Sequence, residues 1–198
     1  MRKIGVVIIT LFALTLFGVS NAAAVTFIPS PSGDMWDLDH YKYYQWGINW
    51  TVPSGETISA AYLEIFNIND WTNETGDILW VNLLNTAPLG VVPSTDNQNS
   101  INAFSGPNTF LIDTYTDETP PYGAVLPGAY LKFNVPATHL YWLADGNFGW
   151  GVDPDCHYYN TGIQMTIETM PVPEPTTLYL LGLGLVGLGI WGRKKFRK

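Results

Sequence analysis

The sequence contains a single cysteine, few basic residues and few charged residues of any kind. Charged side chains make up 13% of the 198 residues, and 9 Lys and Arg stand against 17 Asp and Glu. One cysteine excludes a small domain held together by internal disulfides, and a hydrophobic fraction of 46% excludes an intrinsically disordered chain. No segment between residues 25 and 170 keeps helical apolar spacing over three turns, which excludes a coiled coil there.

The N-terminus has the features of a secretory signal peptide. Arg2 and Lys3 precede an apolar stretch, residues 4–19, and small residues follow it as far as Ala24. A basic start, a short apolar core and small residues at the cleavage point are the three parts of such a signal. We therefore predict a signal peptide over residues 1–24, with an uncleaved N-terminal anchor as the alternative.

A second apolar segment lies near the C-terminus. Residues 176–192 follow a proline-rich stretch and precede a basic tail, residues 193–198. A helix of that length would cover roughly 25 Å, slightly less than the hydrocarbon core of a bilayer. Because basic clusters stay on the cytoplasmic side, we predict a transmembrane helix here that anchors the chain in the inner membrane, with residues 25–170 exported.

The order of these C-terminal features resembles the PEP-CTERM sorting signal, over residues 172–198. In that family an exosortase, a membrane-embedded processing enzyme, recognises the signal in Gram-negative bacteria that make exopolysaccharide and biofilm. The resemblance implies that Pro173, Glu174 and Pro175 are the sorting and processing residues and that an exosortase-like enzyme is a partner. It also implies an inner-membrane precursor that is delivered to the cell surface or extracellular matrix. A plain single-pass anchor on residues 171–198 is the alternative.

The predicted exported domain, residues 25–170, is strongly acidic. Its two lysines, Lys42 and Lys132, stand against sixteen acidic residues, a net charge of −14. Contacts to phosphates need clustered basic side chains, so a nucleic-acid partner is excluded. Cations, basic surfaces and neutral polymers are the partners that this charge allows.

The domain shows apolar and polar residues in alternation, which is typical of strands with one buried face. Pro and Gly separate the alternating segments. About seven or eight short strands at this spacing predict an all-β fold, a single β-sandwich with jelly-roll-like connections. The clearest predicted strand is Gly162–Met170, and the others are Tyr44–Val52, Ser59–Phe66, Asp77–Leu84, Thr109–Tyr115, Tyr130–Val135 and Leu140–Ala144.

Two polar segments of this domain are candidate calcium sites. Calcium takes six to eight oxygen ligands from carboxylates, amides and backbone carbonyls. Neither segment has the spacing of an EF-hand, and ordinary turns use the same residue types, so two structural loops are the alternative. The candidate ligands are Asn67, Asn69, Asp70 and Asp77 in the first segment and Asp153, Asp155 and Asn160 in the second.

Aromatic residues are abundant in the same segments, which suggests a carbohydrate site. Rings would stack on sugar rings while acids and amides bind hydroxyl groups; a self-association surface would look similar. The candidate glycan-binding residues are Trp71, Trp150, Tyr158 and Tyr159.

Zinc is weakly supported by the sequence. Cys156 and the adjacent His157 cannot complete a tetrahedral set, and His40 and His139 lie in unrelated segments. A lone Cys156 is expected either in the core or in a bond between chains.

These observations favour a non-enzymatic protein of the cell surface or matrix that is associated with exopolysaccharide or biofilm and binds carbohydrate. One alternative is a secreted glycan-active hydrolase that uses Asp153 and Asp155, or Asp117 and Glu118, as paired carboxylates. Another is a calcium-stabilised adhesion or structural module. The Gly-x-Ser-x-Gly nucleophile motif is absent from the sequence.

Overall fold

The computed structural model describes residues 22–30, 33–70, 76–97, 100–117, 128–172 and 180–188. The chain divides into two units: residues 23–169, and the terminal segments 1–22 and 170–198. Residues 1–21, which hold most of the predicted signal peptide, lie outside the described part, as do Pro173, Glu174 and Pro175.

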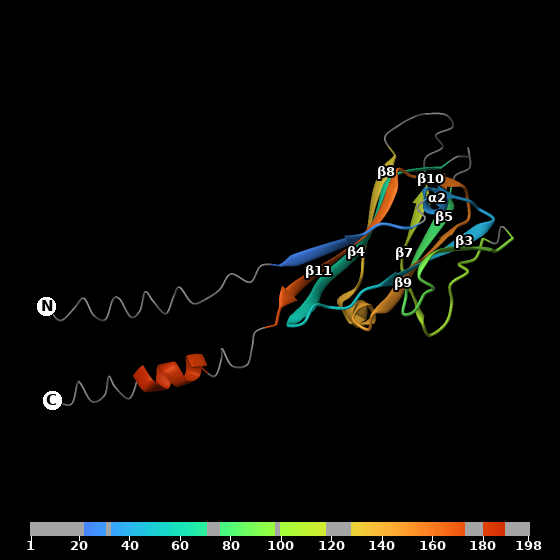
Figure 1. Cartoon of the computed structure of the whole chain (residues 1–198). Helices are drawn as coiled ribbons and strands as arrows, with labels where there is room; N and C mark the ends of the chain where they lie inside the picture. Colours follow the sequence, from blue (N-terminus) through green and yellow to red (C-terminus); the bar gives the residue numbers. More distant parts are fainter. Residues whose placement is uncertain are drawn as a thin grey trace, which may run out of the picture. The chain divides into compact units, whose positions relative to one another are not determined.

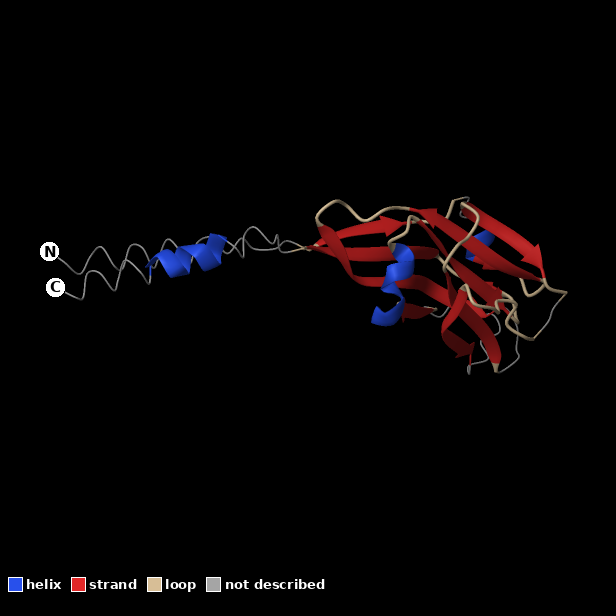
Figure 2. Ribbon diagram, turned by 90° about the horizontal axis from the view of Figure 1, so that it is seen from below, coloured by secondary structure: helices blue, strands red, loops and turns tan. Residues whose placement is uncertain are grey.

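Two antiparallel sheets build the unit of residues 23–169 (Figure 1). The first sheet has the order β1-β11-β4-β10-β2, with β8 also paired to β4, and the second has the order β6-β3-β9-β5-β7. Short segments of helix, α2 (Gly33–Trp36) and the 3-10 helix η1 (Ala137–Leu143), accompany the strands (Figure 2). The first sheet contains β1 (Ala23–Phe27), β2 (Asp37–Leu38), β4 (Glu56–Asp70), β8 (Ala129–Asn134), β10 (Tyr158–Tyr159) and β11 (Gly162–Pro171). The second contains β3 (Lys42–Asn49), β5 (Asp77–Leu84), β6 (Gly90–Thr95), β7 (Thr109–Asp117) and β9 (Asn147–Pro154).

The hydrophobic core lies between the two sheets. Alternate residues of each strand face inward, because successive side chains of a strand point to opposite faces. The indole nitrogen of Trp150 on β9 contacts the sulfur of Met165 on β11, which joins the sheets across the core. This packing confirms the predicted all-β sandwich, while the jelly-roll-like connections stay a prediction. The first sheet contributes Leu63, Ile65, Ile163, Met165 and Ile167, and the second contributes Trp46, Leu79, Val81, Phe148, Trp150 and Val152.

Two strands have bounds equal or close to the predicted ones. β5 has the predicted bounds, and β11 extends one residue beyond the predicted segment. The predicted strand Leu140–Ala144 is wrong, because residues 137–143 form η1. Trp142 and Leu143 are adjacent in the sequence and both buried, which a strand with one buried face does not allow.

The central strand β9 carries no alternation because both of its faces are covered. Every residue from 148 to 154 is buried. A Cβ on Gly149 would lie 2.5 Å from the Cβ of Ala87 and 2.6 Å from the backbone oxygen of Trp46. Buried strands of this kind read as continuous apolar runs, so the alternation criterion misses them.

In the other unit, residues 180–188 are helical, and each of them is exposed. No helix in the described part of the chain combines the length and hydrophobicity that a membrane crossing requires. The predicted span, residues 176–192, reaches beyond the described residues at both ends.

The close packing around Gly149 gives a first prediction. Gly149→Ala should lower the free energy of unfolding by about 1–3 kcal/mol, because the added methyl group meets a backbone oxygen that cannot move aside. Chemical denaturation of the full chain in mild detergent measures this. Gly162→Ala is the matched control, since its Cβ would meet only Phe66 at an ordinary 3.8 Å. Equal stabilities of the two variants would contradict the packing described for β9.

Candidate functional sites

Four rings form a continuous row at the surface near β2 and β10; we call Tyr41, His40, His157 and Tyr159 the ring array. Neighbouring ring centroids are 4.3 Å apart for His40 and Tyr41, 6.1 Å for His40 and His157, and 5.0 Å for His157 and Tyr159. Tyr41 is 51% exposed and Tyr159 is 40% exposed. The array therefore presents aromatic surface to solvent at both of its ends.

Strand pairing brings the two halves of the ring array together. β10 pairs with β2, so that Tyr159 lies opposite Asp37, and the chain then turns at residues 39–41 into β3. The buried Tyr44 fixes this turn, because its hydroxyl accepts a hydrogen bond from the Asp39 backbone N–H at 2.8 Å. The backbone that carries the ring array is therefore held in place by hydrogen bonds.

Two carboxylates lie beside the rings. Asp37 Oδ1 contacts Nε2 of His157, and since a carboxylate only accepts, Nε2 is the donor. Asp39 Oδ1 accepts from the Tyr41 backbone N–H at 3.0 Å, and its Oδ2 lies 3.6 Å from Nζ of Lys42. The site combines aromatic rings with hydrogen-bond acceptors. These groups can stack on a sugar ring and accept hydrogen bonds from its hydroxyl groups.

The predicted glycan-binding residues are only partly suited to that role. Trp150 and Tyr158 are both 0% exposed. Their assignment to a glycan site is wrong, because a ring in the core has no face for a ligand. Tyr159 belongs to the exposed ring array, and Trp71 lies outside the described residues.

A second group of polar side chains is mostly buried, with Asp155 half-buried; we call Asp70, Asp77, Asp117, Asp155 and Cys156 the acidic cluster. Asp70, Asp77 and Asp117 are 5%, 9% and 4% exposed. The ligand atoms of Asp70, Asp77 and Cys156 all lie within 4.8 Å of one another, and the Cys156 thiol donates to Asp70 Oδ1 at 3.4 Å. Cys156 is buried, which agrees with the core position that the sequence offers as one of two alternatives.

Backbone pairing explains how the acidic cluster forms. Asp77 at the start of β5 lies opposite Asp117 at the end of β7. Asp155 follows β9, and its Oδ1 accepts from the backbone N–H of Ile78. Three strand ends thus place carboxylates at one point of the domain.

The surroundings of the acidic cluster favour protonated acids or a bound cation. Burial raises the pKa of Asp77 to about 6, and a hydrogen bond with Asp70 adds to that shift. Burial and the charge of Asp117 raise the pKa of Tyr115 to about 12. Among the described residues, Lys42 lies beside Asp39 and Lys132 lies over the ring of Tyr62, so neither is placed against this cluster.

Tyr158 adds a polar group to the acidic cluster. Its side chain is 0% exposed, and its hydroxyl has no hydrogen-bond partner among the described residues. Burial and then the charges of Asp155, Asp77 and Asp70 raise its pKa, so the hydroxyl lies within the field of these carboxylates.

The predicted calcium ligands do not form one set. Asp70, Asp77 and Asp155 come together in the acidic cluster. Asp153 does not join them, because it lies on β9 and its Oδ2 accepts from the Ala103 backbone N–H at 2.6 Å. Asp117 was not among the predicted ligands, although its position opposite Asp77 brings it to the cluster.

The three predicted asparagine ligands serve local structure. Asn160 donates to the Met35 carbonyl at 2.8 Å and accepts from the Gly162 N–H at 3.0 Å. Asn67, at a positive φ of 49°, donates to Thr161, and Asn69 donates to the Asn67 carbonyl. Amides engaged in this way close turns, as the alternative interpretation of these loops expects.

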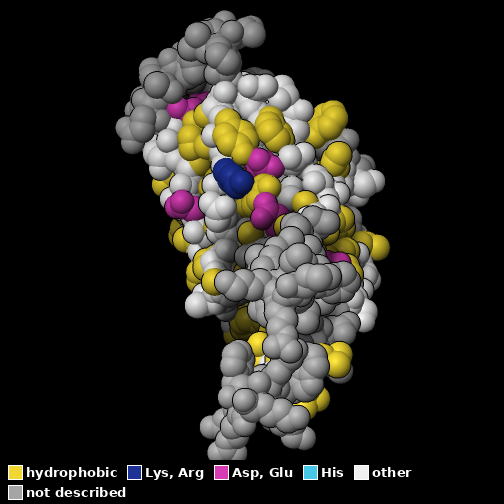
Figure 3. Space-filling model, turned by 90° about the vertical axis from the view of Figure 1, so that its left-hand side faces the viewer, with side chains coloured by type: hydrophobic (Ala, Val, Ile, Leu, Met, Phe, Trp, Pro, Cys, Tyr) yellow, Lys and Arg dark blue, Asp and Glu magenta, His cyan; other side chains and the backbone are white. Residues whose placement is uncertain are grey.

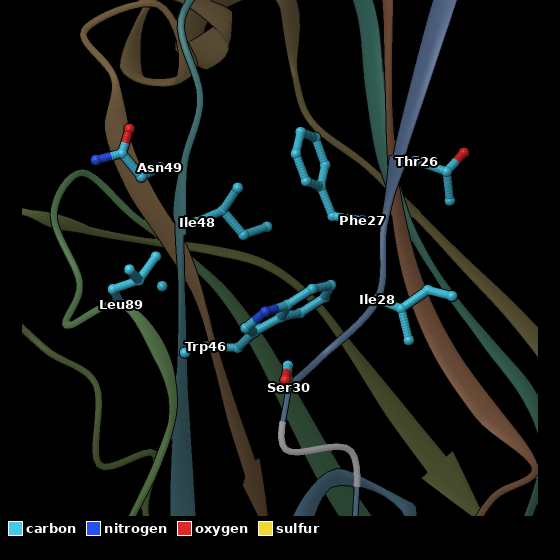
Figure 4. A pocket seen from close by; sticks show the side chains of 10 residues that line it. Thr26, Phe27, Ile28, Ser30, Trp46, Ile48, Asn49 and Leu89 are labelled. Atoms are coloured by element: carbon cyan, nitrogen blue, oxygen red, sulfur yellow. The ribbon is translucent and has the colours of Figure 1, made fainter.

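A separate pocket of about 640 Å³ lies between β1 and β3 (Figure 4). Among the described residues, apolar side chains line most of it and no charged side chain takes part; the lining includes Phe27, Ile28, Trp46, Ile48 and Leu89, with the polar Thr26, Ser30 and Asn49. Such a lining suits an apolar occupant.

The surface of the domain reflects its charge. On the face shown in Figure 3, acidic and hydrophobic side chains are interspersed and basic side chains are scarce. Of the two lysines of this domain, Lys132 lies with its Nζ 3.3 Å from the centroid of the Tyr62 ring.

The buried Asp153 gives a prediction about pH. Burial raises its pKa to about 7, so the folded chain holds this proton while the unfolded chain has lost it above about pH 4. Stability should therefore fall as the pH rises from about 4 to 7, by at most about 1.4 kcal/mol per pH unit, and then level off. Asp153→Asn should remove this dependence.

The difference between the full chain and Asp153→Asn isolates Asp153, because Asp77, whose pKa is about 6, titrates in both proteins. The measurement is the unfolding midpoint of the full chain and of Asp153→Asn at each pH. Parallel pH profiles for the two proteins would refute the raised pKa of Asp153.

Comparison with known proteins identifies one segment of the chain. No curated protein matches the sequence significantly. The family model described as the PEP-CTERM protein-sorting motif matches residues 171–194. This motif supports export and processing by an exosortase through a membrane-anchored precursor. The chain thus carries the PEP-CTERM protein-sorting motif near its C-terminus.

Proposed function

We propose that this protein is a non-enzymatic component of the cell surface or extracellular matrix that binds a neutral exopolysaccharide, in a biofilm, through the ring array. The observation that supports this most is the row of rings, exposed at Tyr41 and Tyr159, with Asp37 and Asp39 beside it. The sorting motif supports the location, because it directs the exported chain to an exosortase.

The charge of the domain selects the kind of glycan. A net charge of −14 over residues 25–170 repels acidic polysaccharides, so a neutral polymer is the favoured ligand. Tyr41 and Tyr159 offer faces for stacking, and the neighbouring carboxylates accept hydrogen bonds from hydroxyl groups.

A hydrolase is less well supported by the same residues. Asp153, one of the two acids considered for that role, is 0% exposed and cannot reach a polymer at the surface. Asp117, from the other pair considered, is 4% exposed.

Removal of the two tyrosines tests glycan binding. Tyr41→Ala and Tyr159→Ala should each weaken binding by between about twofold and tenfold, since an aromatic contact contributes ~0.5–1.5 kcal/mol. Affinity electrophoresis of the full chain in dextran, mannan and β-glucan gels measures this. Tyr141→Ala is the control, because Tyr141 is 67% exposed and lies outside the ring array. Retardation by none of the polymers, or equal retardation of all variants, would overturn the proposal.

A second candidate role is a calcium-stabilised adhesion or structural module, with the ion in the acidic cluster. The observation that favours it is the set of buried carboxylates of Asp70, Asp77 and Asp117, together with the buried hydroxyl of Tyr158, which has no hydrogen-bond partner among the described residues. Oxygen-rich sites of this kind suit calcium better than softer cations.

Thermal melting of the full chain in calcium and then in EDTA tests the calcium role. An ion present at about a hundred times its Kd adds about 2.7 kcal/mol and should raise Tm by several degrees. Asp70→Asn should abolish the rise. Asp113→Asn should keep it, because Asp113 is exposed and hydrogen-bonds the neighbouring Thr114 N–H. An identical melt in calcium and EDTA would rule this role out.

A further inference from the structure

Three side chains at the centre of the ring array have the arrangement of a metal site. One ligand atom each of Asp39, His40 and His157 lies within 4.8 Å of the other two, and all three residues are half-buried. The imidazoles of His40 and His157 meet nearly edge to face, with an interplanar angle of 72°. Segments distant in the sequence therefore place two nitrogens and a carboxylate oxygen around one point.

The composition of this set selects the ion. Two imidazoles and one carboxylate suit a borderline cation such as Zn²⁺, whereas calcium takes oxygen ligands. Three protein ligands also leave a coordination position for an oxygen from outside the chain. The sequence argument against zinc rested on His40 lying in an unrelated segment, and the pairing of β2 with β10 removes that objection.

Neighbouring groups hold two of the three ligands in position. Asp37 accepts from Nε2 of His157, so an ion bound by this ring would be held through Nδ1. A carboxylate on the far nitrogen of a ligand histidine is the usual second partner in zinc sites, and it fixes the tautomer. Asp39 is held through Oδ1 by the Tyr41 N–H, and its Oδ2 faces Nζ of Lys42 at 3.6 Å.

The charges around the set are compatible with a divalent cation. Asp37 and Asp39 supply two negative charges. Lys42 lies 3.6 Å from Asp39 Oδ2, but its side chain is 42% exposed and can turn to solvent. The net field at the site therefore attracts a cation.

We propose that Asp39, His40 and His157 bind a Zn²⁺ ion at the surface of the exported domain, with Asp37 orienting His157. The site is independent of the acidic cluster and needs no glycan for its formation. An ion held here would sit within the ring array and provide a further contact for hydroxyl groups.

Isothermal titration of the untagged full chain in detergent with zinc chloride tests the proposal. The expected result is one zinc ion per chain, with binding lost in His40→Ala and in His157→Ala. Asp37→Asn should weaken binding by about 10- to 100-fold, as second-partner substitutions do at zinc sites. His139→Ala is the matched control, because the third histidine stacks on Phe110 at 3.8 Å, away from this site.

Cobalt substitution distinguishes the ligand sets. The Co²⁺ form should show visible bands without an intense thiolate charge-transfer band, and such a band would assign the ion to Cys156 and overturn the proposal. Circular dichroism confirms that each variant is folded; for a variant that is not, His157→Gln and His40→Gln replace it. Zinc binding that survives both histidine substitutions, or that falls equally in His139→Ala, would also overturn it. Glycan binding is read separately by electrophoresis, so either proposal can fail alone.

Discussion

The alternation of side chains along residues 156–159 is the constraint on which both candidate sites depend. β10 is held between β4 and β2, and a strand sends successive side chains to opposite faces. Cys156 and Tyr158 are 5% and 0% exposed and point into the domain, whereas Tyr159 is 40% exposed. A slip of one residue would exchange the two faces, so correct pairing keeps the acidic cluster inside and the ring array outside.

The charge of the domain determines the chemistry of the buried acidic cluster and of the ring array at the surface. The exported domain has two lysines for sixteen acidic residues, and it nevertheless buries Asp70, Asp77 and Asp117. Burial of a carboxylate is costly unless it takes up a proton or meets a cation, and the raised pKa of Asp77 expresses that cost. On the outer face, Asp37 and Asp39 accept hydrogen bonds from His157 and from the Tyr41 N–H. Aspartate therefore has a raised pKa in the acidic cluster, as at Asp77, and acts as a hydrogen-bond acceptor in the ring array, as at Asp37 and Asp39.

The sequence predicted the parts of the fold that show a period of two. Gly162–Met170 could be assigned because Ile163, Met165 and Ile167 alternate with polar residues in the sequence. β9 could not, since Gly149 and its neighbours are covered on both faces, and Asp153 therefore looked like a loop residue. The site was predicted less well, because the two-residue strands β2 and β10 have no sequence signature. Trp150 and Tyr158 are predicted glycan-binding residues that are buried, whereas Tyr159 is exposed. No sequence pattern indicates that His40 lies near His157.

The most direct test is anomalous X-ray diffraction from crystals of the full chain grown with zinc. It asks whether the ion binds at the ring array on the surface or in the buried acidic cluster. Data collected on both sides of the zinc absorption edge would locate the ion without reference to any variant. The account predicts a zinc peak between His40 and His157, outside the core. A peak at Cys156 within the acidic cluster, or density that leaves both histidines without the ion, would contradict the account.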